Sequence, residues 1–243
     1  MNQLRAELLK IRSTRTTLGL LVGLVALALL FTILTCTLSP APVLLTETEQ
    51  ASLLSFGSIA GVFAALAGIM LFTSEYRFGT IRPTVLFSPH RSRLFVAKFT
   101  AGALAGLVFG IIGEGLVYVI GTTILRARHI TLVMTGANVT ELLVGAVVGA
   151  ALWGALGVGL GAVVPSQVGA VISLLAWGFV AENVVFGFLP KIGRFLPVHA
   201  ADSMMGPLQD RLLPGNVGAL VVVAWTLALA VAGVVLVKRR DVN

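Results

Sequence analysis

Charge is scarce in this sequence. Asp, Glu, Lys and Arg make up only 11% of its 243 residues, whereas soluble domains average about 25%. Hydrophobic residues account for 57%, and the mean hydropathy is +1.01. A soluble fold of this length could not cover so many apolar side chains with polar surface, so the composition predicts an integral membrane protein. The formal net charge of +7 does not indicate a nucleic-acid partner, because the basic residues flank long apolar runs and so suit a lipid bilayer.

Residues that carry chemistry are also few. Cys36 is the only cysteine, which excludes an intrachain disulfide and a thiolate metal site. The three histidines have no H-E-x-x-H-like spacing, and no G-x-S-x-G elbow occurs. We therefore predict no catalytic, metal or cofactor-binding residue, and no enzyme. The chain also lacks a G-x-x-x-x-G-K-[ST] loop for ATP phosphates, so ATP-driven transport would need a separate ATPase.

Long apolar runs fill most of the chain. A helix needs about 20 mostly apolar residues to cross the hydrocarbon layer, and backbone groups in lipid must be satisfied within the segment. The sequence therefore predicts an all-α membrane protein with one transmembrane domain over 1–243. Its six expected spans cover approximately 17–38, 53–73, 99–125, 142–164, 168–189 and 217–237. We expect the long third span to tilt or to break near Gly113-Glu114-Gly115, and residues 190–216 to form short interfacial helices.

The distribution of Lys and Arg predicts the orientation of the spans. Twelve basic residues lie before the first span, between the second and third, and after the sixth, against five in the other connections. Because basic residues are retained on the cytoplasmic side, both termini are expected in the cytoplasm, as for a multi-pass protein of a bacterial cytoplasmic membrane.

Two cytoplasmic segments have amphipathic character. In residues 2–15, Leu4, Leu8 and Ile11 share one helical face, which suits either a helix in the headgroup layer or a simple basic anchor. In residues 74–98, Gly79 can end a helix, Thr80 can cap the next, and Pro89 stops it. This pattern is compatible with a short helix against the cytoplasmic face and equally with an ordinary basic loop, and the residues alone leave both open.

The same segment resembles the permease subunits of bacterial ABC-2 type exporters. The resemblance is carried by Glu75-x-Arg77-x-Gly79-Thr80-Ile81-Arg82, by the run from Pro89 to Arg93, by Ala97-Lys98, and by Arg239-Arg240-Asp241-Val242 after the last span. It implies an N-terminal amphipathic helix and a coupling helix that fits an ATP-binding cassette ATPase. It also implies two permease subunits, identical or different, around the substrate path. The coupling residues that it implies are Glu75, Arg77, Gly79, Thr80, Ile81, Arg82, Val85 and Leu86. Pro83 departs from the helix formers usual at that position.

Three polar residues within the spans are candidates for the substrate path. Glu114 and Glu182 are the only charges in their spans, and a charge in the bilayer centre costs at least about 2.5 kcal/mol. With Asn183 they could form a polar patch near the outer exit. Alternatively, the carboxylates could be structural, with Glu182 bonded to Asn183 or Lys191.

These observations favour the membrane subunit of an exporter, with the substrate left open. The alternatives are a membrane immunity or signalling subunit without transport activity, and an ion-coupled secondary carrier that uses Glu114 and Glu182. Dependence on ATP would separate the exporter from the others.

Overall fold

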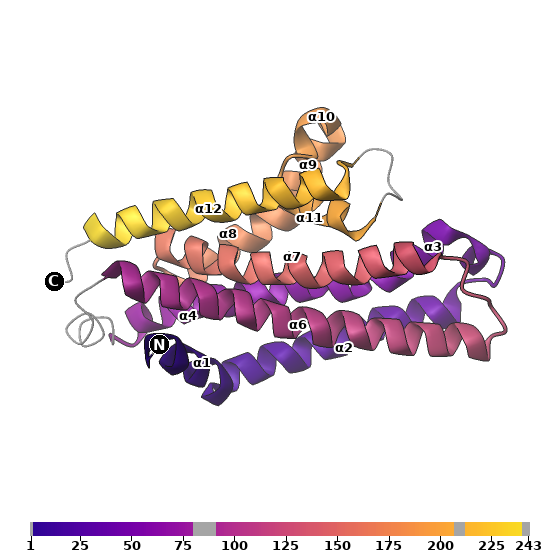
Figure 1. Cartoon of the computed structure of the whole chain (residues 1–243), viewed down its shortest axis with the longest axis horizontal. Helices are drawn as coiled ribbons and strands as arrows, with labels where there is room; N and C mark the ends of the chain where they lie inside the picture. Colours follow the sequence, from indigo (N-terminus) through magenta and orange to yellow (C-terminus); the bar gives the residue numbers. More distant parts are fainter. Residues whose placement is uncertain (1, 80–90, 207–211, 240–243) are drawn as a thin grey trace.

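The computed structural model describes residues 2–79, 91–206 and 212–239, and everything below refers to these residues. They form helices and contain no strand, and six membrane-length apolar helices run along the molecule (Figure 1). The candidate spans are Arg15–Leu38, Glu47–Arg77, Ser92–Ala127, Gly136–Val163, Gln167–Phe188 and Gly215–Val237. The six predicted spans are confirmed, and the chain is a multi-pass membrane protein with an all-α fold.

Two of the six spans contain irregular turns. The second consists of α3 (Glu47–Leu54), a 3₁₀ segment η2 (Ser55–Ile59) and α4 (Ala60–Arg77). The fifth consists of α8 (Gln167–Ala176), a π-helical turn η3 (Trp177–Ala181) and α9 (Glu182–Phe188). The third span, by contrast, is one helix, α6 (Arg91–Ala127), without a break at Gly113-Glu114-Gly115.

Helix α7 (Gly136–Val163) forms the centre of the bundle. It packs against α4, α6 and α12 (Gly215–Arg239). Of the residues in its most apolar 18-residue stretch, 61% are buried. Only 17% of the corresponding window is buried in α2 (Arg15–Leu38), in the span formed by α8, η3 and α9, and 22% in α12. The outer helices therefore present apolar side chains to their surroundings, as expected in lipid.

Close packing around α7 depends on glycine. A Cβ on Gly154 would overlap the carbonyl oxygen of Gly102 on α6, and a Cβ on Gly68 of α4 would overlap the carbonyl oxygen of Gly154. Three helices thus meet with backbone against backbone at Gly154. This is the packing by small residues that membrane helices use.

The chain has two distinct ends. Helix α1 (Asn2–Ser13), the last turn of α4, the first turn of α6 and the end of α12 lie together at one end, which we call the basic end. Helix α3 lies at the opposite end (Figure 1). The short helices α10 (Pro190–Gly193), α11 (Pro197–Asp202) and η4 (Ser203–Met205) connect α9 towards α12. They confirm the short helices expected in residues 190–216.

Buried polar contacts hold the connections at the opposite end. The amide of Gln50 donates to the carbonyl oxygens of Leu44 and Thr131 and accepts from the N–H of Val133, at 2.7–2.9 Å. Arg128 donates to the carbonyl oxygens of Cys36 and Ser39. Because these bonds satisfy backbone groups that would otherwise be buried without partners, they fix the geometry of this end.

Candidate functional site

Four charged side chains meet at the basic end of the bundle, in what we call the four-residue ion network: Glu7, Lys10, Glu75 and Lys98. The Nζ of Lys98 lies 3.0 Å from Oε2 of Glu7 and 2.6 Å from Oε1 of Glu75. It also donates to the carbonyl oxygen of Leu71 at 2.9 Å. The Nζ of Lys10 lies 3.0 Å from Glu7 and 2.8 Å from Glu75. The network thus joins α1 to the end of α4 and the start of α6.

Three of the four members of the network are buried, and its charges balance. Lys98 is fully buried, and Glu7 and Glu75 are buried beside it. Buried ions are tolerated only when they are paired and hydrogen-bonded, and here each lysine contacts both carboxylates. Burial acts to lower the pKa of Lys10, but the adjacent carboxylates of Glu75 and Glu7 outweigh it and raise that pKa above its usual value. Lys10 therefore stays charged at neutral pH.

The apolar face of α1 packs against protein. Leu4, Leu8 and Ile11 lie against a core formed by the basic-end parts of α4, α6, α7 and α12, which includes Phe72 and Phe95. The sequence left open a surface helix or a simple anchor for these residues. The structure shows a helix whose apolar side contacts other helices of the bundle and whose Glu7 enters the ion network. A shift of α4 or α6 would therefore displace α1 directly.

Three of the predicted coupling residues are described. Glu75 belongs to the ion network, and Arg77 donates to the side-chain oxygen of Gln167 on α8 at 3.2 Å. Gly79 has φ +68°, the left-handed conformation that ends a helix at its C′ position, which confirms the predicted end of α4. The other predicted coupling residues, Thr80, Ile81, Arg82, Val85 and Leu86, lie outside the described residues.

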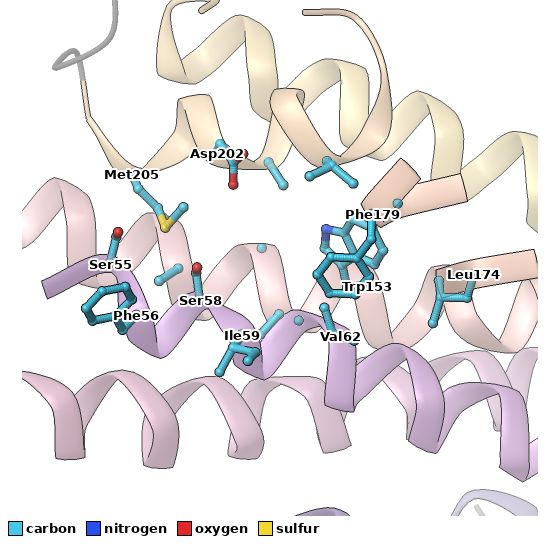
Figure 2. A pocket seen from close by; sticks show the side chains of 18 of the residues that line it. Ser55, Phe56, Ser58, Ile59, Val62, Trp153, Leu174, Phe179, Asp202 and Met205 are labelled. Carbon is cyan, nitrogen blue, oxygen red and sulfur yellow. The ribbon is translucent and has the colours of Figure 1, made fainter. Parts of the chain in front are cut away.

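A cavity of about 390 Å³ lies between η2, α4, α7, the π-helical turn and α11. We call it the aspartate cavity, because Asp202 is the one carboxylate among its lining residues. Figure 2 shows Asp202 and Met205 facing Ser58 and Ile59 across the cavity, with Phe179 and Trp153 at one side. Its walls are mostly apolar with a few polar groups, the composition typical of ligand pockets. Burial raises the pKa of Asp202 to about 6.

The three predicted path residues are not brought together. Asn183 lines the aspartate cavity, while Glu182 lines a second cavity between α7, α8, α11 and α12. Glu114 lines neither cavity. Its carboxylate is buried against Gly57 of η2, where a Cβ would overlap it, and neither of its oxygens has a hydrogen-bond partner in the described structure.

Glu182 has a structural contact that differs from the predicted ones. Its Oε2 accepts from the N–H of Val198 at 2.8 Å, so the carboxylate bonds one of the free N–H groups at the start of α11. The expected partners are not involved: Asn183 donates instead to the carbonyl oxygens of Gly178 and Phe179, and Lys191 forms no ion pair with Glu182 in the described structure.

Sequence reasoning missed Glu7, Lys10 and Lys98 as a group, and it missed Asp202. One signal was available: Glu75 and Lys98 both border predicted spans, at positions where an unpaired charge would be costly. Glu7 also lies between Leu4 and Leu8 on the helix, close to its apolar face. The fold and these sites define a six-helix membrane protein whose N-terminal helix is tied to its second and third spans. No family model and no curated protein matches the chain.

Proposed function

We propose that this chain is the membrane subunit of an ABC-2 type exporter, which forms part of a substrate path and is driven by a separate ATP-binding cassette ATPase. The observation that carries the proposal is the four-residue ion network. It joins α1 to the two helices that flank residues 80–90, the segment whose motifs resemble the exporter's coupling helix. A partner that pressed on this segment would move α4, α6 and α1 together.

The proposal includes an orientation and an assembly. The basic end faces the cytoplasm, because twelve of the seventeen Lys and Arg residues belong to segments predicted on that side. In this orientation, a soluble ATPase and the segment between α4 and α6 are on the same side of the membrane. A second permease subunit, identical or different, packs against the exposed outer helices and completes the path. The aspartate cavity, at the side of α4 and α8, is the part of that path supplied by this chain.

Replacement of Ile81, Val85 and Leu86 together by Ser tests the coupling surface. We expect this variant to insert normally, to lose association with the ATPase and to uncouple ATP hydrolysis from export, because apolar anchors dominate the energy of such contacts. Arg82→Glu should weaken the same contact less. Association and export equal to wild type in the triple variant would contradict the proposed coupling surface.

One observation favours a second function, an ion-coupled carrier. Glu114 is buried in the third span without a hydrogen-bond partner in the described structure, and buried membrane carboxylates often serve proton movement. The exporter predicts ATP-dependent transport that survives collapse of the proton gradient. The carrier predicts the reverse, together with loss of transport in Glu114→Gln.

A further inference from the structure

All three tryptophans of the chain line one cavity of about 290 Å³. Trp153 comes from α7, Trp177 from the π-helical turn and Trp225 from α12, and we call this space the tryptophan cavity. Leu156, Leu160, Leu174, Pro197 and Leu229 complete its apolar wall, and Ser173 and Glu182 are its other polar members. Trp153 and Leu174 line both this cavity and the aspartate cavity, so the two cavities are adjacent.

The cavity holds one buried carboxylate with spare bonding capacity. Glu182 is fully buried. Its Oε2 receives the N–H of Val198, whereas Oε1 has no hydrogen bond of normal geometry in the described structure, although the Trp177 indole lies close enough to interact with the carboxylate. No Lys, Arg or His among the described residues forms an ion pair with it. A buried carboxylate without a counter-charge is costly. A cation in the cavity would supply the counter-charge that Glu182 lacks.

The walls restrict the kind of cation. Tryptophan is the best aromatic partner for a cation, and aromatic surroundings with a nearby carboxylate favour an organic ammonium group whose charge is spread over methyl groups. A hydrated metal ion would need several oxygen ligands, and only Glu182 and Ser173 could offer side-chain oxygens here. The apolar remainder of the wall suits an apolar ligand body.

The cavity is open at the side of the bundle. Trp177 is 48% exposed and Trp225 is 36% exposed, whereas Trp153 is buried. Trp225 is held by a bond from its Nε1 to the carbonyl oxygen of Phe195 at 3.0 Å. A ligand therefore reaches the cavity past the exposed Trp177 and Trp225, which belong to the fifth span and to α12. Such a side suits a ligand that arrives from the lipid phase.

We propose that the tryptophan cavity binds a lipophilic ammonium ion, with Glu182 as its counter-ion and the tryptophans around its head. This proposal rests on the proposed export function only where it treats the bound ion as a substrate, because binding itself needs no ATPase. It adds a charge-recognising residue, Glu182, and a ligand chemistry to the proposed exporter.

Intrinsic fluorescence tests the proposal directly, because every tryptophan of the chain lines the cavity. The purified full chain is placed in nanodiscs of phosphatidylethanolamine and phosphatidylglycerol, and benzyltrimethylammonium is titrated against its neutral isostere neopentylbenzene. We expect a saturable fluorescence change for the cation and at least about tenfold weaker binding of the isostere. Equal binding of the two compounds would overturn the proposal.

Two variants localise the charge recognition. Glu182→Gln keeps an oxygen that can accept the N–H of Val198, so we expect it to fold and to bind the cation about tenfold more weakly. Glu49→Gln changes an exposed carboxylate that lines neither cavity and serves as the matched control, with affinity within about twofold of wild type. Affinity unchanged in Glu182→Gln, or reduced equally in Glu49→Gln, would contradict the assignment.

A lipid arm separates the two sources of the ligand chemistry. Phosphatidylcholine also carries a trimethylammonium head, so the titration is repeated with this lipid added to the nanodiscs. An unchanged affinity supports a free lipophilic cation as the occupant, whereas competition that disappears in Glu182→Gln would overturn the free cation in favour of a lipid head. If cation binding fails while the ATPase still associates, the substrate class is wrong and the exporter stands. If the cation binds but no ATPase associates with the chain in cells, the exporter proposal is wrong and the cation site stands.

Discussion

Lys98 and Glu7 lie 91 positions apart in the chain, yet their side chains form an ion pair of 3.0 Å in the interior of the basic end. This contact attaches an N-terminal helix, which could otherwise have lain on the membrane surface, to the start of the third span. Glu75 accepts from the same Nζ at 2.6 Å, so the pair extends to the end of the second span. The helices on both sides of residues 80–90 are thereby held to one another and to α1.

Loss of Lys98 should destabilise the protein far more than loss of Lys10. Lys98→Met leaves the buried carboxylates of Glu7 and Glu75 with one partner fewer, and breaking a buried ion pair costs about 3–5 kcal/mol. The side chain of Lys10 is 49% exposed, so Lys10→Met should cost no more than about 1 kcal/mol. Denaturant unfolding in detergent, followed by tryptophan fluorescence, measures both. An equal loss in the two variants would show that burial of Lys98 does not matter.

Gly154 should tolerate no side chain larger than hydrogen without loss of helix packing. Gly154→Leu would drive a side chain into the backbone of Gly102, whereas the Cβ of Gly149→Leu, on the same helix, meets no atom within 4 Å. We expect the first variant to aggregate or to elute as a broad peak in gel filtration after solubilisation, and the second to elute like wild type. A sharp wild-type peak for Gly154→Leu would mean that α4 and α6 do not meet α7 so closely.

The spans could be predicted from the sequence because long apolar runs with little or no charge are typical of helices that cross a bilayer. The irregular turns could not. Residues Ser55–Ile59 and Trp177–Ala181 contain no proline, and no local motif marks their 3₁₀ and π geometry. Conversely, the glycines around Glu114 suggested a break in α6 that packing does not require.

The residues of the candidate sites, too, could be predicted only where a local motif marks them. Glu75 and Gly79 were predicted from local motifs, and the end of α4 at Gly79 is a local property of the backbone. The partners of Glu75 come from α1 and α6, so they depend on how helices far apart in sequence are placed. Asp202 was missed because nothing in the loop sequence distinguishes it from an ordinary exposed acid. Only the fold turns it towards the aspartate cavity.

Asp202 should give the protein a pH-dependent stability. Burial raises its pKa from 3.8 to about 6, so the folded state holds a proton that the unfolded state has released. The stability contributed by Asp202 is therefore full below about pH 4 and is lost as the pH rises through about 6. We expect the difference in thermal unfolding midpoint between wild type and Asp202→Asn to change across this window.

His199 is a second titratable group beside Asp202, and its contribution has to be separated from that of the aspartate. Its Nδ1 lies 3.8 Å from Oδ2 of Asp202, and burial lowers its own pKa, which makes the folded state less stable when the pH falls. The carboxylates of Glu182 and Asp202 also repel each other electrostatically. Subtraction of the Asp202→Asn profile from wild type isolates the aspartate, and a difference that is flat between pH 4 and 7 would contradict the raised pKa.

The central claim is that a soluble ATPase contacts the segment between α4 and α6, and crosslinking in intact cells tests it most directly. A photo-crosslinking amino acid is placed at Val85, and at Phe188 as a control, since Phe188 is 83% exposed at the far side of the fifth span. The crosslinked partners are identified by mass spectrometry. We expect Val85 to capture a protein with a G-x-x-x-x-G-K-[ST] nucleotide loop and Phe188 not to capture one. Capture of no nucleotide-binding protein at Val85, or of the same one at both positions, would contradict it.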